Sequence, residues 1–177
     1  MDKKLRADLL RITLMPERAY RKNAAHIARH LVEDPTKGSK FEPGMTFEQI
    51  VILSMWCLCG VRAELIVGRL PEEVRRLPGG HLQLRVLTPY HLGRCGVVAL
   101  SEVPARARVT RALRGTGEDA VEVNVVRMEA STTTALVLSF ARDDRSAWYL
   151  YTAYPGMLAP PMSDRQFWDR HAFIDPP

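Results

Sequence analysis

One histidine and one arginine in the second half of the chain have side chains suited to phosphate chemistry. The segment Thr88–Gly96, TPYHLGRCG, places His91 and Arg94 between two expected strands, and its glycines give the backbone freedom. Histidine exchanges a proton near neutral pH, and arginine stabilises negative charge that develops on a phosphoryl group. We therefore expect His91 to act as general base and Arg94 to hold a phosphate in one cleft. The alternative is a turn whose histidine caps backbone groups.

A second proton-transfer group is expected from the C-terminal tail. His171, in the segment FWDRHAF, can join the first histidine if the tail folds back over the sheet. Two histidines, one as base and one as acid, suffice for transesterification of RNA through its own 2′-hydroxyl. This chemistry needs no metal and no cofactor, and we expect neither.

Aromatic residues are concentrated in the segment Trp148–Gly156. In an ideal strand, alternate side chains point to opposite faces. One predicted face therefore carries Tyr149, Tyr151 and Ala153, and the other Trp148, Leu150, Thr152 and Tyr154. We expect Tyr151, Tyr154 and Trp168 to contact bases of single-stranded RNA, with Thr152 in the catalytic site. The alternative is that the tyrosines are simple packing residues.

Two other sets of residues could in principle hold a metal. His26 and His30 are four residues apart on an expected helix and share a face, which is the geometry of a two-histidine half-site. Arg29 between them would repel a cation, so surface histidines are the preferred interpretation. The three cysteines, Cys57, Cys59 and Cys95, do not have zinc-ligand spacing. The odd count also argues against a disulfide framework.

The composition is that of a globular protein with a basic surface. The chain has 177 residues, of which 46% are hydrophobic and 25% charged, so we expect a single domain over residues 1–177. The formal net charge is +5, and arginine carries most of the excess after Lys40. Arginine is suited to phosphate, so RNA is a plausible partner. A merely solvated basic surface is the alternative.

No segment reads as a secretory signal or as a membrane span. The basic start MDKKLRADLL is not followed by an uninterrupted apolar stretch, and the apolar run Ile50–Val61 is short for a bilayer. We expect no membrane partner and a cytoplasmic site of action. This is compatible with delivery as the C-terminal part of a secreted effector.

The first half, residues 1–78, has mainly helical patterns. Apolar residues at helical spacing predict two short helices before a loop at residues 33–44. Thr46 and Gln49 have the spacing of a capping box, which predicts the start of a buried helix that Gly60 interrupts and that then continues to Val67. Pro71 is expected to start a short charged helix, PEEVRRL.

The second half, residues 79–177, changes to a period of two. Alternating segments near residues 82–87, 97–100, 121–126, 135–140 and 148–151 predict strands, the last two forming a hairpin. Because no helical pattern separates them, the sheet should be antiparallel. We therefore expect an α+β fold in which N-terminal helices pack on a C-terminal antiparallel sheet of about four to six strands, followed by an irregular tail with one helical turn at residues 166–172.

Two segments resemble a known family. The strand that ends in Thr-Ala-Tyr-Pro at residues 152–155 resembles the closing strand of ribonuclease toxins of the barnase, EndoU, colicin and RelE-like superfamily. The first half is similar in order to the histidine-bearing helix, loop and second helix of related toxins, through His26-Ile27, His30-Leu31, residues 38–41 (GSKF), residues 43–47 (PGMTF) and Ile50. The loop at residues 33–36 departs from the pattern, which usually has several glycines and a second histidine there.

The resemblance implies metal-independent cleavage of RNA, often of tRNA. It also implies that Thr152 and Tyr154 lie in or beside the site, and that a small immunity or antitoxin protein is the partner. The alternative function is a non-catalytic accessory module that binds a protein or RNA. In that case the apolar segment Ile50–Val67 would be an exposed interaction surface.

Overall fold

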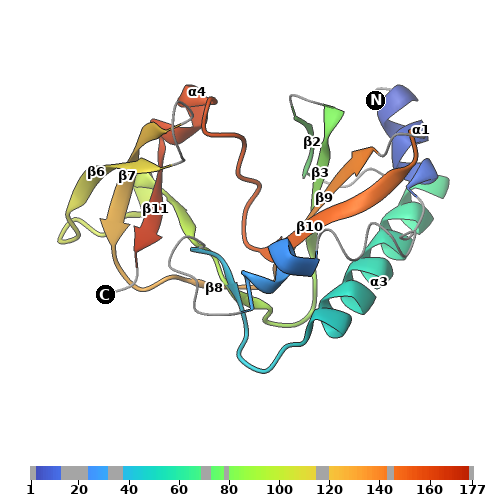
Figure 1. Cartoon of the computed structure of the whole chain (residues 1–177), viewed down its shortest axis with the longest axis horizontal. Coiled ribbons are helices and arrows are strands. Elements are labelled where there is room, and N and C mark those ends of the chain that lie inside the picture. Colours follow the sequence, from blue (N-terminus) through green and yellow to red (C-terminus); the bar gives the residue numbers. More distant parts are fainter. Residues whose placement is uncertain are drawn as a thin grey trace.

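The described chain contains two main sheets and one small sheet (Figure 1). The structure, a computed structural model, describes residues 3–12, 24–31, 38–68, 73–77, 80–114, 120–142 and 146–175. The elements in chain order are α1 (Lys3–Arg11), β1 (Lys40–Phe41), α3 (Phe47–Ile66), β2 (Glu73–Arg76), β3 (Leu82–Leu87), β4 (Gly93–Arg94), β5 (Val97–Ala99), β6 (Val109–Arg114), β7 (Val121–Arg127), β8 (Thr132–Thr133), β9 (Ala135–Arg142), β10 (Trp148–Pro155), α4 (Arg165–Trp168) and β11 (His171–Asp175). The expected α+β class is confirmed.

The first main sheet has the strand order β10-β9-β3-β2 and is antiparallel throughout. Helices α3 and α1 cover one of its faces (Figure 1). The core between them combines buried residues of both layers, among them Ile50, Leu58, Leu65, Leu84, Leu138 and Phe140. The predicted hairpin is confirmed, because β9 and β10 pair directly.

Helix α3 starts as the sequence predicts and runs to Ile66 without the predicted interruption. The side chain of Thr46 accepts a hydrogen bond from the backbone of Gln49, whose own side chain accepts from the backbone of Thr46, so the capping box is present. The predicted interruption at Gly60 is wrong, since the helix continues to Ile66.

By length and apolar composition alone this 20-residue helix could cross a membrane, so the expectation that the segment is too short was wrong. One of its faces packs in the core, as core helices of soluble proteins also do.

The segment expected to form a charged helix is partly a strand. Glu73–Arg76 is β2, an edge strand that pairs with β3, and Val74 packs against the core. Pairing with β3 overrides the weak local helix preference of this short segment. The residues before and after it, 69–72 and 78–79, lie outside the described part.

The second main sheet has the strand order β5-β11-β7-β6 and lies at the other end of the molecule from α1 and α3 (Figure 1). Its strands β11 and β7 are parallel, which corrects the expectation of a purely antiparallel sheet. The tail from β10 crosses to this sheet and ends in α4 and β11 (Figure 1). The helical turn expected at residues 166–172 is therefore only α4, because His171 already belongs to β11.

The division into a helical half and a sheet half is only approximate. Strands β1 and β2 lie in the first half, and α4 lies in the second. Strand β1 joins β4 and β8 in a small antiparallel sheet. This small sheet joins β1, which precedes α3, to β4, which leads into β5 of the second main sheet (Figure 1).

Candidate functional site

Two histidines of a short helical segment lie against the closing strand of the first main sheet. The segment covers residues 24–28 and a turn that ends at Leu31. The ring of His30 stacks on that of Tyr154 with centroids 5.5 Å apart, and the ring of His26 lies 5.6 Å from that of Tyr151. The two imidazole centroids are 6.0 Å apart. The helical segment and the Thr-Ala-Tyr-Pro strand, more than 120 residues apart in sequence, thus meet in space.

One nitrogen of His30 is fixed by the backbone. Its Nδ1 lies 2.8 Å from the carbonyl oxygen of Ser39, and because a carbonyl only accepts, Nδ1 carries the proton. In the neutral ring the lone pair is then on Nε2. The peptide N–H of Phe41 also donates to the carbonyl of His30, so β1 and the residue before it hold the end of the helical segment at two points.

A bulge in β10 decides which of its side chains face the histidines. The register shifts between Leu150 and Thr152, so Tyr151 has no partner in β9. After the bulge Ala153 joins Trp148 and Leu150 in the core. The predicted faces are therefore wrong for the later residues, because Tyr151 and Tyr154 both contact histidines on the face remote from α3.

Tyr154 is a neutral phenol at physiological pH. Burial raises the pKa of its hydroxyl to about 12, although hydrogen bonds from the Ala159 backbone and the Gln83 side chain act in the opposite direction. The phenol therefore keeps its proton and does not serve as a base. On the other side, the ring of Tyr151 makes an edge contact with that of His81, with centroids 5.3 Å apart.

A row of polar side chains crosses the sheet on the same side. Strand pairing aligns Thr152 with Ser139, Ser139 with Gln83, and Gln83 with Arg75. Among the described residues, buried atoms without a hydrogen-bond partner include Thr152 Oγ1, Gln83 Oε1 and Arg75 Nη1. Gln83 is 6% exposed and Thr152 is 5% exposed. Three unsatisfied polar atoms in one row are unusual, since buried polar groups are normally paired.

This row reaches the second main sheet through Arg75. Its guanidinium carbon lies 5.9 Å from the ring centroid of Phe167, in α4. Phe167 stacks flat on His171, with centroids 3.8 Å apart and an interplanar angle of 4°. We call the set of His26, His30, His81, Tyr151, Tyr154, Gln83, Arg75, Phe167 and His171 the junction.

Two glycines allow β1 to lie close to the segment before β5. A Cβ on Gly96 would lie 2.1 Å from the carbonyl carbon of Gly38, and one on Gly93 would lie 1.9 Å from the carbonyl oxygen of Lys40. The backbone of Gly96 also donates to the Ser39 hydroxyl. The glycines expected to free His91 therefore instead position Ser39, which fixes His30.

The structure brings together some of the residues predicted from the sequence. Tyr151 and Tyr154 contact histidines, and Thr152 belongs to the polar row. Arg94 is exposed and pairs in register with Lys40, so two cations lie side by side next to Ser39. His171 resembles His30 in one respect, because its Nδ1 also donates to a backbone carbonyl. The acceptor is the carbonyl oxygen of Phe167, at 2.8 Å.

Two other predicted residues lie elsewhere. His91 is exposed in the loop before β4 and has no hydrogen bond, ion pair or ring contact with any described residue. His91 precedes β4, whereas His171 pairs with Ala99, the last residue of β5. Strands β4 and β5 therefore lie along the chain between His91 and the residue that pairs with His171. Trp168 is buried, and its indole N–H donates to the Pro161 carbonyl, so its ring is not available for stacking on a substrate.

Sequence reasoning missed most of the polar residues of the junction. His26 and His30 were interpreted as surface residues, which is wrong for His30, since it is only 5% exposed. Both also form part of the segment that resembles the toxins. Gln83 and Arg75 give no local signal, because only strand pairing aligns them. The spacing of four residues did indicate that His26 and His30 share a face, and the same spacing of Phe167 and His171 could have predicted their contact.

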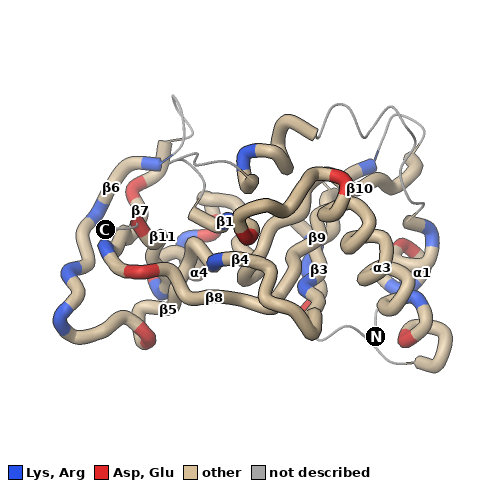
Figure 2. The backbone as a smooth tube through the Cα atoms, turned by 90° about the horizontal axis from the view of Figure 1, so that it is seen from below, with Lys and Arg blue, Asp and Glu red and all other residues tan. Residues whose placement is uncertain are grey.

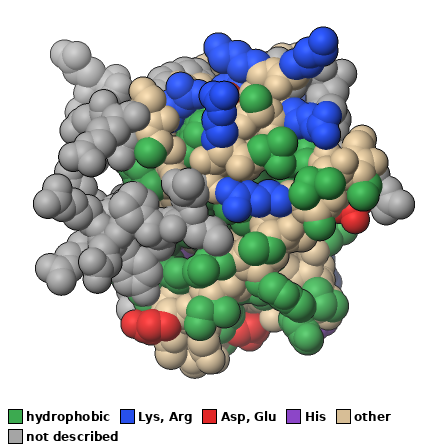
Figure 3. Space-filling view, turned by 90° about the vertical axis from the view of Figure 1, so that its right-hand side faces the viewer, with side chains coloured by type: hydrophobic (Ala, Val, Ile, Leu, Met, Phe, Trp, Pro, Cys, Tyr) green, Lys and Arg blue, Asp and Glu red, His purple; other side chains and the backbone are tan. Residues whose placement is uncertain are grey.

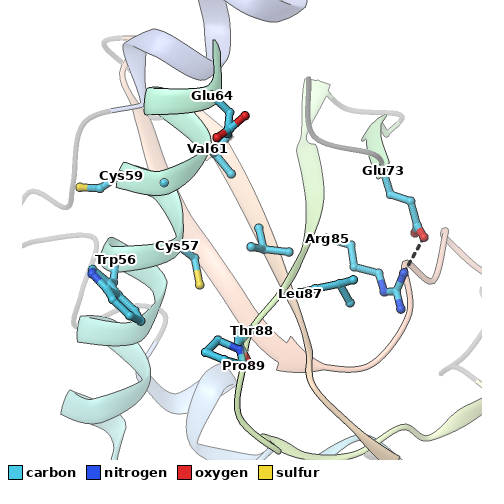
Figure 4. A pocket seen from close by; sticks show the side chains of 12 residues that line it. Trp56, Cys57, Cys59, Val61, Glu64, Glu73, Arg85, Leu87, Thr88 and Pro89 are labelled. Carbon is cyan, nitrogen blue, oxygen red and sulfur yellow. Dashed lines mark hydrogen bonds and ion pairs between the residues drawn. The ribbon is translucent and has the colours of Figure 1, made fainter. Parts of the chain in front are cut away.

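A pocket of about 590 Å³ lies away from the junction, between α3 and β3 (Figure 4). Helix α3 contributes Trp56, Cys57, Cys59, Gly60, Val61 and Glu64, and the opposite side consists of Glu73, Arg85, Val86, Leu87, Thr88 and Pro89. Burial raises the pKa of the Cys57 thiol to about 11. The thiol is therefore protonated at neutral pH and is a poor nucleophile. Arg85 is already paired with Glu73 at 2.6 Å. The pocket thus suits an apolar ligand better than a phosphate reaction.

Comparison of the chain with protein-family models, with curated proteins and with solved structures finds no match. The site is accordingly interpreted from its own residues.

Proposed function

We propose that the chain is an endoribonuclease of toxin type that cleaves RNA, with tRNA as a candidate substrate, and that needs no metal. In this proposal His26 and His30 are the proton-transfer pair, in place of the pair His91 and His171 that the sequence alone suggested. Tyr154 donates a hydrogen bond to the phosphate, and Arg94 with Lys40 supplies positive charge.

The contact between His30 and Tyr154 carries the proposal. It joins the two segments that resemble ribonuclease toxins, and the hydrogen bond to Ser39 gives His30 a defined tautomer. An acid and a base on either side of a phosphodiester must each come within hydrogen-bond reach of it. A centroid separation of 6.0 Å between the two imidazoles is compatible with that requirement.

The reaction that follows is transesterification. One imidazole takes the proton of the 2′-hydroxyl, whose oxygen forms a bond to phosphorus while the bond from phosphorus to the 5′ oxygen breaks. The other imidazole gives a proton to the departing 5′ oxygen. The neutral phenol of Tyr154 and the nearby cations stabilise the charge on the phosphoryl oxygens. The products are a 2′,3′-cyclic phosphate and a 5′-hydroxyl.

Incubation of the purified chain with tRNA and total RNA, with and without a chelator, tests the proposal. We expect cleavage in both conditions and products that end in 2′,3′-cyclic phosphate. His30→Ala and His26→Ala should each lower the rate by about 100-fold or more, because a proton-transfer group contributes about that much. Circular dichroism should show an unchanged fold.

The variant His91→Ala distinguishes the two assignments of the base. Loss of cleavage in this variant, with full activity in His30→Ala, would restore the assignment made from the sequence. RNA that stays intact in every condition would remove the nuclease proposal altogether.

A second candidate function is a protein-binding module, and the exposed face of α3 favours it. Ile52, Trp56 and Ile66 are 65%, 63% and 71% exposed, and Figure 3 shows apolar side chains on this side of the molecule next to basic ones. Large apolar side chains gathered in the open often mark an interaction site. A small inhibitor protein could bind there as well as at the site of cleavage.

Sedimentation of the isolated chain tests this candidate. If the face is an interaction surface, the wild type should self-associate with rising concentration, and Trp56→Ser should remain monomeric. A wild type that is monomeric at every concentration would argue against it.

A further inference from the structure

Helix α4 and strand β11 contribute a stacked pair of aromatic rings to the junction. Phe167 and His171 are stacked and half-buried, so neither residue is fully enclosed by the described chain. The hydrogen bond from His171 to the Phe167 carbonyl fixes the imidazole plane, and a perpendicular contact with Trp168 at 4.9 Å fixes the phenyl plane. Rigid aromatic planes of this kind are the usual platform for a nucleobase.

One polar group with an unpaired atom lies beside Phe167, and a second is aligned with it across the sheet. The guanidinium of Arg75 is at the outer limit of a contact with Phe167, and its buried Nη1 has no hydrogen-bond partner in the described part of the chain. Gln83 is paired with Arg75 in register and its Oε1 is likewise unpaired, although the residue is more than nine-tenths buried. An unpaired buried donor or acceptor costs free energy, which a ligand group can recover.

The two unpaired groups differ in what they would bind. An arginine N–H donates and is suited to a phosphate oxygen, whereas an amide Oε1 accepts and is suited to an N–H on the edge of a base. Burial and the contact of Gln83 with the Tyr154 hydroxyl keep this amide in place. A phosphate, a base edge and a stacking plane are together the features of one nucleotide.

We propose that Phe167, His171, Arg75 and Gln83 form a nucleotide subsite for single-stranded RNA next to the site of cleavage. The base stacks on the Phe167–His171 pair, Gln83 Oε1 accepts a hydrogen bond from the base edge, and Arg75 holds the adjoining phosphate. The subsite rests on the proposed function for its role in cleavage. Its binding of RNA can be measured separately.

Binding of a fluorescent 2′-O-methyl RNA oligonucleotide to the full chain tests the subsite, because this probe has no free 2′-hydroxyl and is not cut. Fluorescence anisotropy gives the dissociation constant. We expect Phe167→Ala to weaken binding by about 5- to 100-fold, which is the effect of losing one base stack. Arg75→Ala should weaken it to a similar extent, and Phe167→Tyr should bind like the wild type. The charge-matched control is Arg11→Ala, at the far exposed end of α1.

A probe with one base removed identifies the stacked position. At the subsite, an abasic nucleotide should weaken binding to the wild type but cause no further loss in Phe167→Ala. If Phe167→Ala, Arg75→Ala and Arg11→Ala all bind like the wild type, or if every abasic probe weakens Phe167→Ala as much as the wild type, the subsite does not exist. Binding that depends on Phe167 while natural RNA stays intact would keep the subsite and reject the nuclease.

Should Phe167→Ala fail to fold, as a thermal melt would show, Phe167→Leu and Gln83→Leu provide the same comparison. Gln83→Leu should weaken binding of probes that offer an N–H at the stacked base. It should have no effect on the abasic probe. Equal loss with both probes would overturn the role of Gln83.

Discussion

The chemistry of the junction depends on a few side chains whose protonation is set by their surroundings. His30 and His171 each donate Nδ1–H to a backbone carbonyl, so both present the same tautomer. Tyr154 lies between the histidine pair and the polar row, and its raised pKa keeps the phenol protonated. A neutral donor that does not titrate suits a group that stabilises charge during the reaction.

Tyr154→Phe should lower the rate of RNA cleavage by about 100-fold, the effect of removing one donor to developing negative charge. Because the pKa of Tyr154 is about 12, the phenol does not titrate below pH 10. The pH–rate profile between pH 5 and 10 should therefore keep its shape in the variant. Tyr149→Phe, on the same strand, is the control and should retain wild-type rates. An alkaline limb that moves only in Tyr154→Phe would contradict this role.

At the scale of elements, the position of His30 depends on a close crossing of two backbone segments. Gly96 allows Ser39 to approach, and Ser39 holds His30. Gly60, by contrast, is exposed on α3. A Cβ at this position would have nothing within 4 Å. The two glycines thus offer a matched pair of substitutions.

Gly96→Ala should destabilise the protein and reduce cleavage, because a Cβ would collide with the backbone of Gly38. Gly60→Ala should instead raise the free energy of unfolding by about 0.5–1 kcal/mol, since alanine is the better helix former. Urea unfolding and RNA cleavage of both variants provide the measurement. Equal stability of the two variants would mean that the crossing is not tight.

Helix α1 is held to the first main sheet by one buried carboxylate. Asp8 is 3% exposed and pairs with Arg76 of β2 and, at 2.9 Å, with Arg142 of β9. Burial alone would raise the pKa of Asp8, but hydrogen bonds from Arg76 and Trp148 and the charges of both arginines outweigh it and lower the pKa below its ordinary value of 3.8.

A carboxylate whose pKa is lowered by folding stabilises the folded protein fully when the pH is above the pKa that it has in the unfolded chain. This stabilisation is lost as the pH falls through the pKa that it has in the folded protein. Asp8→Asn should therefore lower the free energy of unfolding by about 1–3 kcal/mol at pH 7. The difference from the wild type should shrink below pH 4. Urea unfolding at pH 7 and at pH 3 measures it, and a difference that grows toward low pH would contradict the assignment.

Elements with a strong local signal could be predicted, whereas those that depend on pairing could not. The capping box at Thr46 and the alternation of β9 and β10 specify their own structure. Strand β2 has a helix-like sequence and becomes a strand because β3 offers a partner edge. The bulge at Tyr151 leaves no trace in the residue types, yet it changes which side chains face the histidines. For that reason the site was predicted in part, with Tyr151, Thr152 and Tyr154 but without the histidines that contact them.

At the scale of the whole molecule, the two main sheets carry different surfaces. The side of α3 is partly apolar (Figure 3), whereas basic residues follow β6 and the chain that precedes it (Figure 2). Arg106 and Arg108 are exposed there and have no partner among the described residues. The neighbouring strand β7 receives a hydrogen bond from Arg165 of α4, the helix that carries Phe167. An RNA strand that leaves the junction past α4 would therefore meet these arginines.

The salt dependence of RNA binding measures this contact. Each phosphate neutralised on a single strand contributes about 0.7 to the slope of log affinity against log salt concentration. Replacing Arg106 and Arg108 by Gln removes two such contacts and should thus reduce the magnitude of the slope by about 1.4. Replacing Lys3 and Arg11, the exposed first and last residues of α1, by Gln removes the same charge and should leave the slope unchanged. The same uncut RNA probe, titrated at four or more salt concentrations, gives both slopes. Equal changes in the two double variants would show that net charge alone attracts RNA and that its path does not follow the second main sheet.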